Sequence, residues 1–345
     1  MSGYFIGTSI VINDDAAYIH ESFSTVGVGT TENVKITDSD GVSYDNFGYS
    51  VAVGSGRIVV GAFGDDDDGS ASGSAYIFDL DGNQLAKITA SDAAAGDYFG
   101  HSVAVGSGRI VVGAHGDDGK GSAYIFDLDG NQLTKITASD GAGGDFFGYS
   151  VAVGSSRIVV GAIYDDDDGS ASGSAYIFDL DGNQLTKITA SDAVADDNFG
   201  ISVAVGSGRI VVGAHRDDDN GTDSGSAYIF DLDGNQLTKI TASDGAGGDR
   251  FGYSVAVGSG RIVVGAYLDD NNGSAYIFDL DGNQLTKITA SDGAGGDFFG
   301  RSVAVESGRI VVGAFSDDNK GSAYIFNLPE DSNTYWERVL ETYKY

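Results

Sequence analysis

The chain has 345 residues, of which 51 are acidic and 19 basic, and its formal net charge is −32. A surface of this sign repels phosphate backbones and anionic lipid, so we expect no nucleic-acid partner and no membrane insertion. The absence of Cys excludes disulfides, thiol redox chemistry and thiolate metal sites. The hydrophobic residues, 41% of the chain, alternate regularly with polar ones, which argues against intrinsic disorder.

The N-terminal stretch MSGYFIGTSIVINDD has no basic residue ahead of its apolar ones, so we identify no ordinary signal peptide. No apolar run approaches the ~18 residues of a membrane span. If the protein works outside the cell, three explanations are open. The sequence is that of the mature chain, or export needs no leader, or cell lysis releases the protein.

Six near-identical copies make up most of the chain. The stretch FGYSVAVGSGRIVVGA at 47–62 returns five times with few changes. The later copies begin at Phe99, Phe147, Phe199, Phe251 and Phe299. Successive copies start 52 or 48 residues apart, and the differences all fall between the Val-Gly-Ala and Gly-Ser-Ala-Tyr motifs. An insertion tolerated at one place marks a surface loop.

Each copy predicts four short strands. In the first copy they are SVAV (50–53), RIVVGA (57–62), SAYIFDL (74–80) and QLAKITA (84–90). They are rich in β-branched and aromatic residues, and the GSG and DLDGN segments between them suit tight hairpins because Gly accepts a positive φ. Four antiparallel strands about every 50 residues are the period of a β-propeller blade. The fourth strand, with Lys87, is expected at the outer edge, where charge discourages aggregation.

The number of blades depends on the first 46 residues. Aligned on Ser9, IGTSIVINDDAAYI falls on FGYSVAVGSGRIVV, and VKITDSDGVSYDN falls on the fourth strand and its exit. We therefore predict an all-β, seven-bladed β-propeller of four-stranded antiparallel blades, with the tail TYWERVLETYKY as the last fourth strand. The alternative is six blades, with the N-terminal VKITD strand closing the ring.

The predicted organisation is one propeller domain over 1–345. Its parts are a degenerate first blade at 1–46, repeats at 47–98, 99–146, 147–198, 199–250 and 251–298, and a last blade with the C-terminal strand at 299–345.

The order Phe-Gly, then Val-Gly-Ala, then Gly-Ser-Ala-Tyr-Ile-Phe resembles the FG-GAP repeat of integrin α-subunit propellers and their bacterial and viral relatives. The resemblance is plain over 47–328 and faint over 6–46. Near-identical copies are also similar to repeats of marine microbial and tailed-phage surface proteins. The resemblance implies a β-propeller that serves adhesion, ligand binding or scaffolding.

Relatives of this kind often hold Ca²⁺ in an Asp-rich hairpin between the FG and GA motifs. Here that hairpin reads VGSGR, or VESGR in the last copy, so those sites are not carried over. The DLDGN segment begins like an EF-hand loop but has Lys87 and Ala90 at its ninth and twelfth positions, so we interpret it as a hairpin turn. Arg57 begins the second strand and Asp79 closes the neighbouring antiparallel third strand. We expect the two side chains to pair across the sheet as a structural contact.

Runs of Asp between strands two and three are the candidate Ca²⁺ ligands, because this ion prefers carboxylate oxygens. These loops should share one face with the blade-to-blade crossings, where solvent or cations must relieve the repulsion between carboxylates. The alternative is a solvating acidic surface with Asx turns. The candidate ligands are Asp66, Asp68, Asp117, Asp166, Asp168, Asp217, Asp219, Asp269 and Asp317.

Positions that differ among the copies lie near the inner strand ends on that same face. They are mostly aromatic, His or Arg, which anchor binding sites, whereas drift after a recent duplication, the alternative explanation, should favour small polar residues. The candidate ligand-binding residues are Phe63, His115, Ile163, Tyr164, His215, Arg216, Tyr267 and Phe315 after Val-Gly-Ala, and Tyr98, Phe146, Arg250 and Phe298 before Phe-Gly. The residues after Phe-Gly vary too: Tyr49, His101, Tyr149, Ile201, Tyr253 and Arg301.

No nucleophile and base recur together, so we expect no enzyme. We predict a non-catalytic binding or adhesion module that recognises a glycan or a protein on another surface. The alternatives are a structural component of a virion or extracellular assembly (a decoration, fibre or spacer, bound to its other subunits) and a Ca²⁺-binding surface protein. Each implies an extracellular, cell-surface or virion location.

Overall fold

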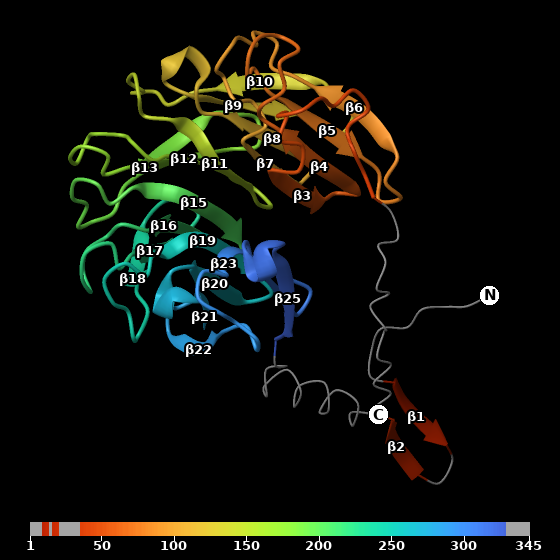
Figure 1. Ribbon diagram of the computed structural model, residues 1–345, viewed down its shortest axis with the longest axis vertical. Coiled ribbons are helices and arrows are strands. Elements are labelled where there is room, and N and C mark those ends of the chain that lie inside the picture. The colour runs from red at the N-terminus through yellow and green to blue at the C-terminus, as the bar shows by residue number, and fades with distance from the viewer. Residues whose placement is uncertain (1–8, 14–15, 21–34, 329–345) are drawn as a thin grey trace. The chain divides into compact units, whose positions relative to one another are not determined.

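The computed structural model describes residues 9–13, 16–20 and 35–328. The chain divides into two compact units, residues 1–36 and 37–345. In the first unit the described strands are β1 (Ser9–Asn13) and β2 (Ala16–His20), which form an antiparallel hairpin. In the second unit the described strands form six antiparallel sheets, numbered here as blades 1 to 6 (Figure 1).

Each of blades 1 to 5 has four strands, and blade 6 has three among its described residues. Blade 1 contains β3 (Ser50–Gly54), β4 (Arg57–Ala62), β5 (Ser74–Phe78) and β6 (Gln84–Ile88). Blade 2 contains β7 (Ser102–Gly106), β8 (Arg109–Ala114), β9 (Ser122–Phe126) and β10 (Gln132–Ile136). Blade 3 contains β11 (Phe147–Val153), β12 (Ile158–Ala162), β13 (Ser174–Phe178) and β14 (Gln184–Ile188).

The remaining blades repeat this order. Blade 4 contains β15 (Phe199–Gly206), β16 (Arg209–Ala214), β17 (Ser226–Phe230) and β18 (Gln236–Ile240). Blade 5 contains β19 (Phe251–Gly258), β20 (Arg261–Ala266), β21 (Ser274–Phe278) and β22 (Gln284–Ile288). Blade 6 contains β23 (Phe299–Glu306), β24 (Arg309–Ala314) and β25 (Ser322–Asn327). The described helices are three short 3₁₀ turns: η1 (Asp117–Gly119), η2 (Asp269–Asn271) and η3 (Asp317–Asn319).

The predicted strands and their hairpin order are confirmed. In blade 1, β3 pairs with β4 from Ser50↔Gly61 to Gly54↔Arg57, and the connecting Ser55 and Gly56 have φ values of 50° and 74°. A two-residue turn with positive φ at both positions matches the twist of the strands that it joins. The repeated GSG segment is therefore a hairpin turn.

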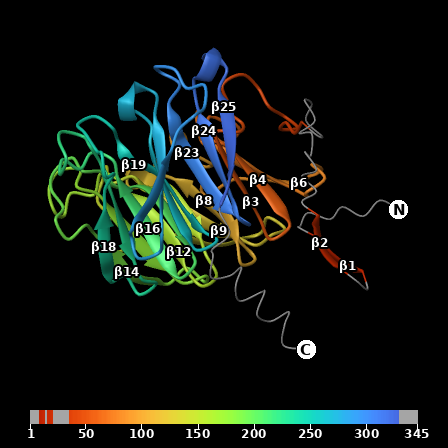
Figure 2. The ribbon, with the colours of Figure 1, turned by 90° about the horizontal axis from the view of Figure 1, so that it is seen from below.

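Neighbouring blades share their cores. One buried cluster joins Val59 and Ile77 of blade 1 to Phe99, Ile110 and Tyr124 of blade 2, and equivalent clusters lie between the following blades. In Figure 1 the blades follow one another in colour order, and Figure 2 shows the same sheets after a quarter turn. Each blade therefore depends on the next for the burial of its apolar face, as in other repeat folds.

The glycines of the FG and VGA motifs permit this close packing. A Cβ on Gly113 of blade 2 would lie 2.0 Å from the carbonyl oxygen of Gly148 in blade 3, and Gly113 has no positive φ that would itself require glycine. The same close approach recurs at Gly61, Gly161, Gly213 and Gly265. The space between adjacent backbones therefore selects glycine here.

The prediction of seven blades is wrong, because the second unit has six, the number predicted as the alternative. The expected degenerate blade at 1–46 contributes only the β1–β2 hairpin among its described residues, although the hairpin repeats the register of β3 and β4. His20 and Lys35 are 15 residues apart, whereas their counterparts Gly61 and Lys87 are 26 apart. The segment that corresponds to the third strand and its loop is therefore shorter than in the six copies.

Two further sequence predictions are not tested by the fold. The tail TYWERVLETYKY lies outside the described residues. That residues 1–345 form one domain stays a prediction.

We expect Gly113→Ala to destabilise the protein by roughly 1–3 kcal/mol or more, because the new methyl group forces blades 2 and 3 apart. The matched control is Gly143→Ala, which also lacks a positive φ and whose Cβ would meet its nearest atom at 4.0 Å. Urea denaturation of both variants checks the prediction. Equal midpoints for the two variants would contradict it.

Candidate functional site

The loops between the second and third strands and the crossings between blades lie on one face, as predicted. The amides of Gly96, Tyr98 and Phe99, in the crossing to blade 2, donate to the carbonyl oxygens of Ser70, Ala71 and Ser72 at 2.9–3.0 Å. Equivalent bonds link the later loops and crossings. The variable residues and the Asp loops therefore share this face.

The residue before each Phe-Gly has a left-handed backbone. The φ values are 59° at Asn46, 55° at Tyr98, 58° at Phe146, 55° at Asn198, 61° at Arg250 and 59° at Phe298. This conformation costs a residue with a Cβ roughly 1–2 kcal/mol and is tolerated best by Gly, Asn and Asp. Four of the six positions nevertheless hold Tyr, Phe or Arg. Drift alone favours the residues that relieve the strain, so these side chains need another explanation.

The variable aromatic side chains, with Arg301, form two groups of ring contacts, one over blades 1 to 3 and one over blades 4 to 6, which we name together the aromatic collar. Its members are Tyr49, Phe63, Tyr98, His101, His115, Phe146, Tyr149, Tyr164, His215, Tyr253, Tyr267, Phe298, Arg301 and Phe315. Tyr98 stacks on His115 with centroids 5.1 Å apart and planes 8° apart. The Arg301 guanidinium lies 5.0 Å from the Tyr253 ring centroid and 5.1 Å from that of Phe315.

Residues after Phe-Gly bring separate blades together. Burial raises the pKa of Tyr149, and the nearby hydroxyls of Tyr253 and Tyr49, from blades 5 and 1, raise it further. Since blades 1, 3 and 5 are not neighbours in the sequence of blades, these tyrosines lie near the centre. The sequence comparison identified the position after Phe-Gly as variable, but we did not include its residues among the candidate ligand-binding residues.

Part of the collar is open to solvent. Phe315 is 68% exposed, Tyr49 56% and Tyr164 40%. A cavity of about 730 Å³ is lined by Tyr49, Tyr253, Arg301 and Phe315, among others. These side chains offer ring faces and one guanidinium to a ligand.

Other predicted site residues do not face outward. Ile163 and His215 are buried, with 3% and 8% exposure. Arg250 makes a bidentate ion pair with Asp223, at 2.9 and 3.0 Å. These three side chains are therefore not free to contact a ligand. The differences among the copies identified these positions as variable, but such differences carry no information on burial.

Two histidines of the collar are held neutral. Burial lowers the pKa of His115 to about 3, with a smaller contribution from His101, whose ring centroid is 4.4 Å away. Burial also lowers the pKa of His101, and the backbone oxygen of Tyr149 lies 3.3 Å from its Nδ1. The Nδ1 of His115 has no hydrogen-bond partner among the described residues.

The Asp loops hold a lysine in each of blades 1 to 5. In blade 4 the Lys239 ammonium lies 2.8 Å from Asp192, 2.8 Å from the buried Asp217, and also contacts Asp219. It also lies 5.3 Å from the centroid of the Tyr228 ring. The equivalent lysines are Lys87, Lys135, Lys187 and Lys287. We name this arrangement the lysine cage.

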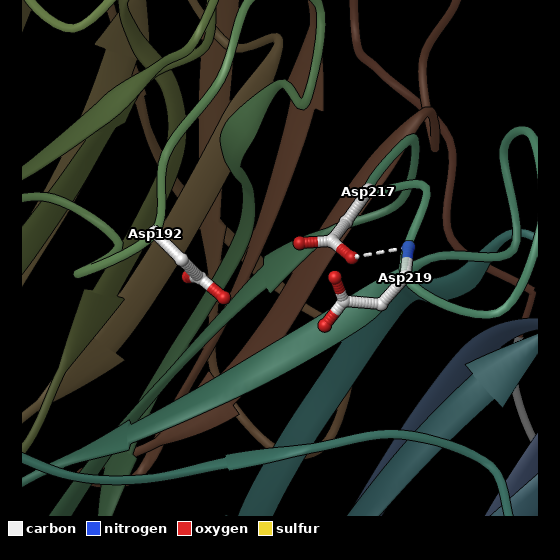
Figure 3. A group of neighbouring side chains, drawn as sticks. All are labelled: Asp192, Asp217 and Asp219. Atoms are coloured by element: carbon white, nitrogen blue, oxygen red, sulfur yellow. Dashed lines mark hydrogen bonds between the residues drawn. The ribbon is translucent and has the colours of Figure 1, made fainter.

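The lysine cage changes the interpretation of the predicted cation sites. Asp192, Asp217 and Asp219 are the one group of three carboxylates within metal-binding distance among the described residues, and Figure 3 shows them facing one another. The Lys239 ammonium holds the position that a cation would take. Burial lowers its pKa, but the hydrogen bonds of the three carboxylates outweigh this and raise the pKa above its ordinary value.

The other candidate Ca²⁺ ligands have protein partners or face solvent. Asp117 and Asp269 are buried and paired with Lys135 and Lys287. Asp66 and Asp166 accept the amides of Ala71 and Ala171 at 2.7 Å, and Asp68 and Asp168 are exposed. Asp317 accepts a hydrogen bond from the Tyr324 hydroxyl at 3.1 Å. The outer-strand lysines, which we expected to protect the sheet edge from aggregation, are thus counter-ions of the Asp loops.

The pairing predicted between Arg57 and Asp79 within one sheet is wrong. Arg57 donates to the carbonyl oxygen of Leu128 in blade 2 at 3.1 Å and lies 3.6 Å from Asp129. Asp79 instead accepts from Asn83, within its own turn. The arginine is structural, as expected, but it joins adjacent blades. The alignment of strand ends had suggested a pair within one sheet, whereas the turn of the next blade is nearer.

A sequence model of the FG-GAP repeat matches six segments. They are residues 30–78, 83–126, 131–178, 183–230, 235–278 and 283–326. Together they cover about four fifths of the chain, so the chain belongs to the FG-GAP repeat family, with the β-propeller fold described above. The sequence matches no curated protein. In the described part of the chain no helix is long and apolar enough to span a bilayer.

We expect Lys239→Met to destabilise the protein by roughly 3 kcal/mol, because the buried Asp217 loses its counter-ion. The three carboxylates should then bind Ca²⁺, so that millimolar Ca²⁺ raises the melting temperature of the variant above its value in chelator. The parent should melt at the same temperature in both, because the ammonium holds the site.

The matched control is Lys120→Met, because Lys120 donates to the Gly141 carbonyl at 3.0 Å and makes no ion pair among the described residues. Its stability should stay within about 0.5 kcal/mol of the parent. Stabilisation of the parent by Ca²⁺, beyond that given by monovalent salt, would show that the cages accept metal and contradict the prediction.

The neutral His115 also predicts a pH dependence. Below pH 6.5, the pKa of His115 in the unfolded chain, the unfolded imidazole binds a proton that the folded imidazole excludes. The free energy of unfolding therefore decreases as the pH is lowered, by about 2 kcal/mol from pH 6.5 to pH 5. His115→Phe keeps the ring stacking and should remove this loss. Asp197, whose pKa burial raises to about 6, acts in the opposite direction but is common to both proteins.

Denaturation midpoints of the parent and His115→Phe at pH 7.5, 6.5 and 5 measure this effect. Phe63→Leu, at the equivalent position of blade 1, is the control and should keep the pH dependence of the parent. Parallel curves for the parent and His115→Phe would show that the imidazole titrates normally in the folded state.

Proposed function

We propose that this protein is a non-catalytic binding module and that the aromatic collar holds a carbohydrate chain. The observation that carries the proposal is the strained backbone before each Phe-Gly. Tyr98, Phe146 and Phe298 keep large rings where Asn or Gly would relieve the strain. Retention of these rings, together with the exposed Tyr49 and Phe315, is explained by a ligand that stacks on them.

A carbohydrate fits the collar better than a protein surface. A stable protein interface buries about 800 Å² on each partner around a central cluster of anchors. The exposed rings of the collar are few, and two of them, Tyr49 and Phe315, border a cavity of about 730 Å³, which suits a narrow ligand. Tyr hydroxyls and the surrounding carboxylates supply acceptors for sugar hydroxyl groups, and the −32 charge of the chain disfavours a strongly anionic ligand.

The test is binding of the purified protein to a printed array of neutral and acidic oligosaccharides, followed by calorimetry with the best one. Replacement of Tyr49, Tyr164 and Phe315 together by Ser should weaken binding at least about tenfold, because exposed anchors contribute more than 1 kcal/mol each. The melting temperature should change little, since exposed substitutions alter stability by about 0.5 kcal/mol or less.

The control variant replaces Leu85, Leu133 and Leu185 by Ser on the outer strands, where these side chains are 49–50% exposed. It should bind like the parent. If the parent binds no oligosaccharide, or if both variants bind equally well, the carbohydrate proposal fails, and a protein ligand or a scaffolding role takes its place.

A further inference from the structure

One cation of the aromatic collar has no carboxylate partner. Arg301, which follows the Phe-Gly motif of blade 6, makes no ion pair among the described residues. Its guanidinium instead lies 5.0, 5.5 and 5.1 Å from the ring centroids of Tyr253, Tyr267 and Phe315. The chain has 51 acidic and 19 basic residues, and the cage lysines and Arg250 are paired with carboxylates. An arginine surrounded by rings is therefore an exception that needs an explanation.

The cavity beside this guanidinium is free of carboxylates. Its volume is about 730 Å³, and its lining includes Tyr49 of blade 1, Tyr253 of blade 5, and Arg301, Ser302 and Phe315 of blade 6. The other lining residues are Gly, Ala and Ser, so no Asp or Glu borders the cavity in the described part of the chain. The cavity thus carries a local positive charge in a molecule whose net charge is −32.

The polar groups around the cavity can donate several hydrogen bonds. A guanidinium has five N–H donors and no acceptor, and contact with rings leaves most of these donors unused. The Ser302 hydroxyl makes no hydrogen bond to the described residues. Burial raises the pKa of Tyr253, against a smaller opposite effect of the Arg301 charge, so the Tyr253 hydroxyl stays protonated and can donate. A ligand that fills the cavity must therefore present acceptors to it.

A carboxylate is the acceptor that suits this arginine best. Because the N–H groups of a guanidinium form a planar fork, they pair with the two oxygens of a carboxylate in one plane. A planar carboxylate continues the guanidinium plane between the rings that flank it, whereas a tetrahedral phosphate or sulfate group is thicker. The geometry around Arg301 therefore favours a carboxylate over these other anions.

Repulsion from the rest of the chain limits the charge of the ligand. Exposed charges more than about 8 Å apart are largely screened at physiological ionic strength, whereas direct contact with a half-buried guanidinium is screened much less. One carboxylate on the fork of Arg301 therefore gains more than it loses to the −32 charge. Each further anionic group would lie outside the cavity, where it adds repulsion without gaining a partner. These conditions select a ligand with a single carboxylate.

We propose that the carbohydrate bound by the aromatic collar is an acidic sugar, with one uronic or sialic acid on an otherwise neutral chain, and that Arg301 binds its carboxylate in the cavity. The inference rests on the proposed function, because it names the class of carbohydrate. The neutral part of the chain stacks on the exposed rings of Tyr49 and Phe315. A wholly neutral chain would leave the donors of Arg301 unpaired, so this residue determines specificity.

The test compares two forms of one sugar. The printed array carries each neutral oligosaccharide beside counterparts that end in glucuronic acid, in sialic acid or in a sulfated sugar. Calorimetry is then performed with the carboxylated oligosaccharide that binds best and with its methyl ester, which has nearly the same size but no charge. The parent should bind the acid at least about tenfold more tightly than the ester, because hydrogen bonds to a charged group contribute at least that factor.

Arg301→Gln should bind the acid and the ester equally, and the ester as tightly as the parent does. The fold accepts uncharged residues at this position, because its equivalents include Tyr49, Tyr149 and Ile201. The matched control is Arg309→Gln, which removes the same charge from an exposed arginine at the opposite end of β24 in the same blade. This control should keep the preference of the parent for the acid.

Three results would overturn the inference. Equal affinity of the parent for the acid and the ester is the first, and the Ser variant of the collar then shows separately whether the carbohydrate proposal stands. A preference for sulfated over carboxylated sugars, or an equal loss of preference in Arg309→Gln, would show that the fork of Arg301 does not select a carboxylate. If the parent binds no oligosaccharide, the proposed function and this inference both fail.

Discussion

The face that carries the Asp loops and the aromatic collar depends on one ion-pair network in each of blades 1 to 5, the lysine cage. A carboxylate as buried as Asp217 is stable only with a partner, because a charge removed from water without one costs several kcal/mol. Lys239 supplies that partner from the outer strand, and Asp192 joins it from the preceding crossing. The network therefore ties an outer strand, a loop and the previous blade together, and the loops that carry the collar are fixed by it.

The lysine cage also explains how a chain with a charge of −32 remains compact. Many of its carboxylates lie in loops on one face, where their repulsion opposes folding. Each ammonium contacts up to three of them, and Tyr228 and its counterparts place an aromatic ring beside the cation. The remaining Asp side chains cap their own turns, as Asp66 and Asp79 do, or are exposed to water. The chain itself thus supplies internal cations.

The repeat period and the alternation of residues were enough to predict the strands, their hairpins and the propeller class. The blade count was wrong because the alignment on Ser9 detects the similarity of one hairpin, β1–β2, and one hairpin does not make a blade. The cages were missed because Lys87 and Asp40 are 47 residues apart, and their contact exists only after two blades pack. The variable positions were found by comparing copies within one chain, but burial separated His215 and Ile163 from the exposed rings.

Near-identical copies create a problem of specificity that their own sequences cannot solve. The edge of β25 fits the outer strand of any copy, including a strand from another molecule, because the QLTKI sequence is nearly the same in blades 1 to 5. Among the described residues β25 has no second partner strand, and an edge of this kind favours association between chains unless it is covered, so the fold must direct each outer strand to its own blade.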